Sequence, residues 1–166
     1  GHTWQILEGG EGVRWYVEVG NYTPSTDAAD FSVREEKDGF ADRYLGAGIE
    51  NEGIMEYTSI YTPEACFRYK LKTDPPQGLK MSYKSYDNYL TNEPATYTAL
   101  SFDDKGEAWT QPTQFYVGYG YSSVRMLHKL NIETEKAGFL NYEVAVYDKD
   151  KKTLLARFDK SLRIVK

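Results

Sequence analysis

The sequence predicts an all-β protein, an antiparallel β-sandwich of seven to nine short strands in a jelly-roll-like arrangement. Apolar and polar residues alternate with a period of two along much of the chain, whereas a sustained period of 3.6 residues is nearly absent. Turn-forming Gly, Pro, Asn and Asp separate the alternating segments. The chain has 166 residues, 40% of them hydrophobic, which is enough to bury one continuous core, so we expect a single domain over residues 1–166.

The first strand is expected at residues 14–22, where Trp15, Val17 and Val19 share one face. The sequence from residue 20 to residue 62 is rich in loop-forming residues. The only helix that its pattern allows is a short one over residues 25–36, capped by a Ser or Thr at its start.

Residues 65–73 and 79–86 are predicted to form an antiparallel hairpin. In the first of these strands Phe67 and Tyr69 point inward, while Arg68 and the lysines that follow it point outward. The intervening sequence DPPQG ends the strand because proline cannot donate a hydrogen bond to a β-ladder.

The second half of the chain continues the alternating pattern. The sequence DDKG is a tight turn of the kind that joins adjacent strands. A closed lipocalin-like barrel is the alternative to the sandwich, since both are built from such strands. Further strands are expected at residues 95–102, 107–114, 113–123, 126–135, 141–147, 154–158 and 162–166.

Charge and composition exclude several classes of partner. The net charge of −5 and the isoelectric point near 5.1 argue against nucleic acid, which is bound through clustered Lys and Arg. No apolar run approaches the roughly 20 residues that cross a bilayer, so we expect no membrane insertion. The start Gly1-His2 is consistent with a processed secreted chain or a cloning remnant, and an extracellular or cell-surface location is expected.

Residues for catalysis are few, and we expect no enzyme activity. Cys66 is the only cysteine, which excludes an intrachain disulfide, and no base stands near it in the sequence. His2 and His128 do not have a metal-binding spacing, and His128 lies in an alternating segment where a core imidazole is the simplest interpretation.

A cluster of acidic residues surrounds Gly106. Asp103, Asp104 and Glu107 could bind a structural calcium ion through oxygen, although they lack the full DxDxDG spacing. A plain hairpin turn is the simpler interpretation of the same residues.

The aromatic residues are the strongest functional signal, because the chain holds 15 Tyr but only 7 Phe. Exposed rings with polar neighbours complement sugars, which present C–H faces for stacking and hydroxyls for hydrogen bonding. A tyrosine-rich strand can equally be a packed sheet face, since tyrosine favours β-structure. The predicted ligand-binding residues are the stacking rings Trp109, Tyr86, Tyr89 and Tyr116 and the hydroxyl partners Asp87, Asn88 and Gln111.

One segment adds a resemblance to a family. The sequence YLGAGIENEGIMEYTSIYTPEACFRYKLKTDPPQGLKMSYKS, residues 44–85, is similar to β-sandwich carbohydrate-binding modules and related galactose-binding-like accessory domains. The resemblance covers about a quarter of the chain. It implies a polysaccharide or oligosaccharide ligand held by one or two exposed aromatic rings, often a structural calcium, and attachment to a larger protein. The ligand-binding tryptophan usual near the end of such modules is missing here.

The function predicted from the sequence is therefore non-catalytic binding of a polysaccharide. Two alternatives stay open. One is a structural or adhesive domain of a larger surface protein or glycosidase, which binds protein. The other is a lipocalin-like carrier or enzyme with a cavity around His128.

Overall fold

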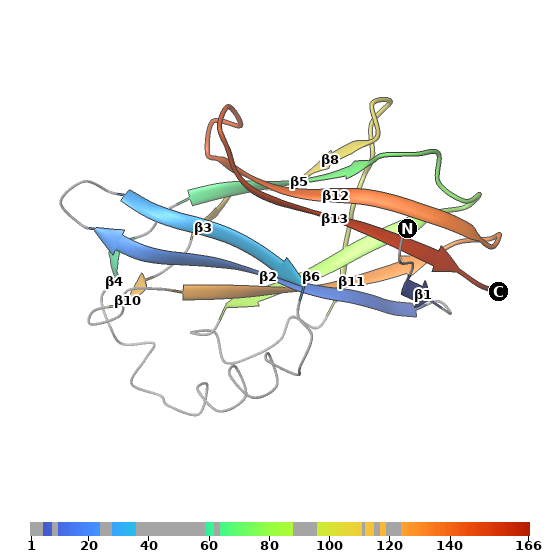
Figure 1. Ribbon diagram of the computed structural model, residues 1–166, viewed down its shortest axis with the longest axis horizontal. Coiled ribbons are helices and arrows are strands. Elements are labelled where there is room, and N and C mark those ends of the chain that lie inside the picture. Colours follow the sequence, from blue (N-terminus) through green and yellow to red (C-terminus); the bar gives the residue numbers. More distant parts are fainter. Residues whose placement is uncertain are drawn as a thin grey trace.

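The computed structural model of the protein contains two β-sheets that face each other across a hydrophobic core (Figure 1). It describes residues 5–7, 10–23, 28–35, 59–61, 64–87, 96–110, 112–114, 117–118 and 124–166. These residues contain strands and no helix, and therefore no helix long and apolar enough to span a membrane. The predicted all-β sandwich is confirmed. The lipocalin-like barrel is wrong, because the sheets of the described chain stay separate and none of them closes on itself.

The first sheet has six strands, and it is antiparallel except where its edge strand β1 runs parallel to β13. β12 lies near its centre, paired with β13 on one side and β5 on the other. The strands in order are β1 (Gln5–Leu7), β13 (Leu154–Ile164), β12 (Gly138–Asp148), β5 (Glu64–Leu71) and β8 (Glu107–Trp109), with β9 (Thr113–Gln114) also paired to β5.

The second sheet has five antiparallel strands, with β11 at its centre. A separate two-stranded sheet pairs β10 (Val117–Gly118) with β4 (Ser59–Tyr61). The strands of the larger sheet in order are β3 (Ala28–Glu35), β2 (Gly10–Thr23), β11 (Val124–Glu133), β6 (Lys80–Asp87) and β7 (Thr98–Ala99).

The strands differ in length from the expectation of seven to nine short ones. The described chain has thirteen segments, of which seven are eight residues or longer and six have only two or three residues. Residues 154–164 form one long strand, β13, where two were predicted. Residues 113–123 were predicted as one strand, but their described part forms the two short segments β9 and β10.

The predicted hairpin of residues 65–73 and 79–86 is wrong. β5 belongs to the first sheet and β6 to the second, so the proline-containing connection crosses from one layer to the other. The DDKG turn is present, with the Gly106 amide donating to the Asp103 carbonyl at 3.0 Å, but β7 and β8 on either side of it also belong to different sheets. Turn signals therefore indicated where strands end and not which strands pair.

The short helix allowed over residues 25–36 is also wrong, because its described part forms strand β3. β3 pairs with β2 in antiparallel register, with Val33 opposite Val17 and Phe31 opposite Val19. Phe31 and Val33 both pack against the core. Period-two burial thus outweighs the local capping signal, since tertiary packing overrides weak helix propensity.

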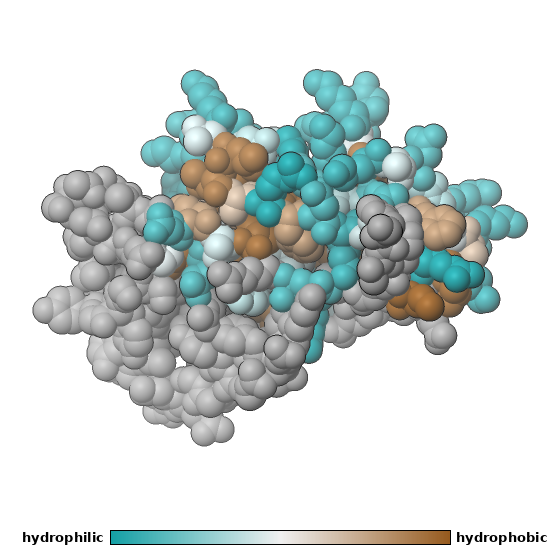
Figure 2. All heavy atoms as spheres, viewed as in Figure 1, coloured by the Kyte–Doolittle hydropathy of each residue, from teal (hydrophilic) through white to brown (hydrophobic). Residues whose placement is uncertain are grey.

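The inward faces of both sheets make one core. Its largest fully buried side chains include Trp15, Phe67, Tyr69, Leu130 and Tyr142. Figure 2 shows hydrophobic residues between the two layers and hydrophilic residues along the outer side of the layer that contains β12. The predicted alternation in β2 and β5 is confirmed, because Trp15, Val17, Val19, Phe67 and Tyr69 are all buried.

His128 is part of this core, as its simplest interpretation predicted. It is 1% exposed, and its imidazole stacks on the Trp15 indole with ring centroids 4.0 Å apart. Phe67 meets the imidazole edge-on at 4.9 Å, and Tyr83 lies 6.0 Å away. Neither imidazole nitrogen has a hydrogen-bond partner among the described residues. Burial lowers the pKa of His128 to about 3, so the ring is neutral at physiological pH.

Because His128 protonates more readily when the chain is unfolded, the neutral ring should make stability depend on pH. The neutral ring contributes fully to the free energy of unfolding above the unfolded-state pKa of about 6.5, and this contribution is lost as the pH falls below that value. We expect the free energy of unfolding, measured by urea denaturation, to fall by on the order of 1 to 2 kcal/mol between pH 7 and pH 5. The variant His128→Phe should not show this loss, because it has no imidazole at this position. Equal losses in the two proteins would contradict a buried neutral imidazole.

Candidate functional site

The outer face of the first sheet, the side turned away from the core, carries the most distinctive group of polar and aromatic side chains. Because Phe67 and Tyr69 point into the core, Arg68 between them points outward. Strand register then places Trp109 of β8 beside Arg68, and Arg157 of β13 two strands farther on. Three spacings between neighbouring strands separate Trp109 from Arg157, about 14 Å in all.

Arg68 organises this face. Its Nη1 donates to the Tyr147 hydroxyl at 3.0 Å, and its Nη2 donates to Glu143 Oε1 at 2.5 Å. The guanidinium carbon lies 5.0 Å from the centroid of the Tyr147 ring and 5.9 Å from that of Trp109, within the range of cation–π attraction. Arg68 therefore joins both rings and one carboxylate into a single layer.

Glu143 is shared by two arginines. Its Oε1 accepts from Arg68, and its Oε2 lies 3.1 Å from Nε of Arg157. The side chains of Arg68 and Glu143 are only 14% and 12% exposed, so this ion pair is largely shielded from water. Arg157 reaches Asp159 as well, at 2.5 Å, and that pair is about 45% exposed. The network is thus most buried at Glu143 and open to solvent at its Arg157 end.

The two rings meet at the other end of the network. Trp109 and Tyr147 pack edge to face with centroids 5.2 Å apart, and both are half-buried. Lys151, from the turn between β12 and β13, places its ammonium 5.0 Å from the Trp109 centroid. We call the group of Trp109, Tyr147, Arg68, Glu143 and Arg157 the platform.

The platform contains one of the ligand-binding residues predicted from the sequence, Trp109. Tyr86 and Asp87 belong to β6 in the opposite sheet, so the predicted grouping of Tyr86 with Trp109 does not occur on one sheet. The side chains of Tyr86 and Asp87 are not described. The remaining predicted residues, Tyr89, Asn88, Gln111 and Tyr116, lie outside the described residues.

Sequence reasoning missed Tyr147, Arg68, Glu143 and Arg157 as site residues. The outward direction of Arg68 was predicted from alternation, but Arg68 and Tyr147 are 79 residues apart in the chain. Only the pairing of β5 with β12 brings them together, and no local signal indicates that pairing.

The acidic cluster proposed for calcium makes a turn in the structure. Asp103 Oδ1 accepts hydrogen bonds from the backbone amides of Lys105 and Glu107, each at 2.9 Å, and these bonds lower the pKa of Asp103. Glu107 points to Lys70, 3.9 Å away. Within the described chain no three His, Cys, Asp or Glu residues come together as a metal site, and calcium binding by Asp103, Asp104 and Glu107 stays a prediction.

Cys66 also lies on the outward side of β5, but it is buried. Its thiol faces the carbonyl of Lys149 at 3.7 Å, and burial is the main cause that raises its pKa. A raised pKa leaves the thiol protonated, which makes it a poor nucleophile.

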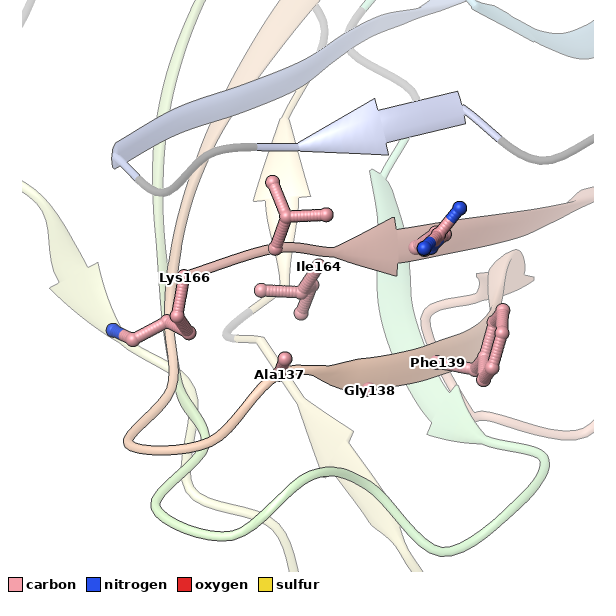
Figure 3. A pocket seen from close by; sticks show the side chains of 7 residues that line it. Ala137, Gly138, Phe139, Ile164 and Lys166 are labelled. Carbon is pink, nitrogen blue, oxygen red and sulfur yellow. The ribbon is translucent and has the colours of Figure 1, made fainter.

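A shallow groove of about 410 Å³ opens at the far end of the same sheet, between the start of β12 and the end of β13 (Figure 3). Ala137 and Gly138 form one wall, and Ile164 and Lys166 form the other. Phe139 is 52% exposed beside it, and no second described ring lines the groove. The groove therefore lacks the paired rings and the hydrogen-bonding network of the platform.

Comparisons with known proteins add no assignment. No protein-family model matches the chain, and no curated protein matches it. Among solved structures, it is similar to one titled "AvmM Catalyzes Macrocyclization in Alchivemycin A Biosynthesis", with 12% identity over 66% of this chain and 72% of that chain. The TM-score is 0.29, and a likeness at that level carries no argument about function.

Removal of the shared carboxylate should destabilise the fold more than loss of an exposed one. In the variant Glu143→Gln the Arg68 guanidinium keeps its buried position without a charged partner, and we expect the free energy of unfolding to fall by about 1 to 3 kcal/mol. The control Asp159→Asn removes a solvent-exposed partner and should cost less than about 1 kcal/mol. Urea denaturation measures both, and similar losses would show that Glu143 is not the central partner.

Proposed function

We propose that the protein is a non-catalytic carbohydrate-binding module whose ligand lies on the platform. The observation that carries this proposal is the pair of half-buried rings, Trp109 and Tyr147, on an outward sheet face with hydrogen-bonding side chains next to them. Half-buried rings have a fixed orientation and keep part of their apolar surface in contact with water. A sugar ring can cover that surface with its C–H face.

The side chains around the rings supply partners for sugar hydroxyls. Arg157 and Asp159 are about 45% exposed and keep donor and acceptor atoms close to solvent. The row from Trp109 to Arg157 spans about 14 Å, long enough for a short oligosaccharide. If each ring contact contributes about 1 kcal/mol and several hydrogen bonds add to it, the dissociation constant falls in the micromolar to millimolar range.

The chemistry of the platform supports binding rather than catalysis. Glycoside hydrolysis needs one carboxyl group as an acid and a second as a base or nucleophile. Here Glu143 and Asp159 both accept from Arg157, which holds them as structural partners of a guanidinium. Affinity in the proposed range suits a module attached to a larger extracellular protein, where a second binding site raises the overall affinity.

The variant Trp109→Ala tests the proposal. We expect retention in affinity gels that contain the polysaccharide ligand to weaken at least tenfold, which corresponds to about 1.4 kcal/mol, because the main stacking surface is gone. Since Trp109 is only half-buried, the variant should remain folded, with a loss of stability of about 1 kcal/mol. The matched control is Phe139→Ala, which removes an exposed ring from the same sheet outside the platform.

A glycan array identifies the ligand for that gel. Equal retention of the Trp109→Ala variant and the intact protein would exclude the platform as the sugar site. An array without a binder at millimolar ligand, together with a captured protein partner, would favour the adhesive-domain alternative instead.

A further inference from the structure

The turn between β12 and β13 holds Lys151 in a defined position. Asp148 Oδ1 accepts from the backbone amides of Lys152 and Thr153 at 2.7 and 3.0 Å, and the Lys151 amide donates to the Asp148 carbonyl at 3.0 Å. The two amide bonds to its carboxylate lower the pKa of Asp148, so the cap persists at neutral pH. The turn is therefore fixed at its base by a single side chain.

Lys151 has an unusual backbone conformation. Its φ is 61°, and among the described residues it is the one residue other than glycine with a positive φ. A Cβ atom is disfavoured in this left-handed region, where Gly or Asn is normally found. Residues that keep such strain are enriched at functional sites. The side chain of this residue is the one that reaches the Trp109 ring.

The cation next to the rings is the Lys151 ammonium. Lys151 pairs with no carboxylate within the described part of the chain, and its ammonium lies 5.0 Å from the Trp109 centroid. Arg157 adds a guanidinium that is 45% exposed at the other end of the platform.

We propose that Lys151 makes the platform selective for an acidic polysaccharide, whose sugars carry carboxylate groups. This inference rests on the proposed function, and it names the ligand class of the same site. The Lys151 ammonium lies over the Trp109 ring, so a sugar that packs against the exposed part of this ring lies next to the ammonium, which can form a charge-assisted hydrogen bond to a carboxylate. A neutral sugar gains only the stacking contact and weaker hydrogen bonds.

Two polymers with the same sugar backbone distinguish the effect of ligand charge on binding from the effect of ligand shape. Polygalacturonate carries one carboxylate on each sugar, and its fully methyl-esterified form carries none. We expect affinity electrophoresis to give at least tenfold stronger retention by polygalacturonate than by the ester. Retention by polygalacturonate should also weaken as salt rises from 50 to 500 mM, because exposed ion pairs are screened.

The variant Lys151→Gly tests the residue itself. Glycine adopts the observed φ without strain, so the turn should remain intact, and thermal unfolding checks this. We expect Lys151→Gly to lose most of the preference for polygalacturonate over the ester. The matched control Lys152→Gln removes a neighbouring cation of the same turn and should keep the preference.

The outcomes separate this inference from the proposed function. Equal binding of both polymers, or a preference unchanged in Lys151→Gly, would overturn the role of Lys151 and leave carbohydrate binding intact. No binding of either polymer, with binding of a neutral glycan that requires Trp109, would overturn the acidic ligand alone. No binding of any glycan would overturn both.

Discussion

The contacts of Trp15 between the two sheets are the constraint on which the rest of the structure depends. Its indole lies at the centre of the core, stacked on His128 of β11 and edge-on to Phe67 and Tyr69 of β5. The indole Nε1 donates to the Tyr69 hydroxyl at 2.9 Å, so two polar atoms that burial would otherwise penalise satisfy each other. This hydrogen bond explains how the core tolerates a phenol at this position. Tyr142 lacks such a bond, since its buried hydroxyl has no partner among the described residues.

The same contacts determine what the outer face of the first sheet presents. Side chains alternate along a strand, so burial of Phe67 and Tyr69 under Trp15 forces Arg68 to the outside. A shift of one residue in the register of β5 would bury Arg68 and expose both rings, at a cost that the core cannot offset. The position of the platform is therefore a consequence of the core, because one strand carries both sets of residues.

The sequence was sufficient to predict the alternating strands and the two-layer class, because period-two burial is a local signal. It was insufficient to predict which strands pair. Residues 65–86 looked like a hairpin because a Pro-Gly turn joined two alternating segments, yet the turn spans the layers and β5 pairs with β12. The site depends on that non-local pairing. Trp109 could be selected for its polar neighbours, whereas Tyr147 gained its role only from its place beside Arg68.

The hydrogen bonds of the platform divide its residues into supports and possible ligand contacts. Both terminal nitrogens of Arg68 are bonded within the protein, and its Nε is buried without a partner among the described residues. The Arg68 side chain is only 14% exposed and its unpaired Nε is buried, so Arg68 positions the rings and Glu143 more than it offers donors to a ligand. Under the proposed function, donors for a ligand come from the rim, where Arg157 is partly exposed and the Lys151 ammonium lies over the Trp109 ring. In that arrangement Arg68 and the two rings determine the shape of the binding surface, and Arg157 and Lys151 at the rim supply its charge. A preorganised surface of this kind loses little entropy when a ligand binds.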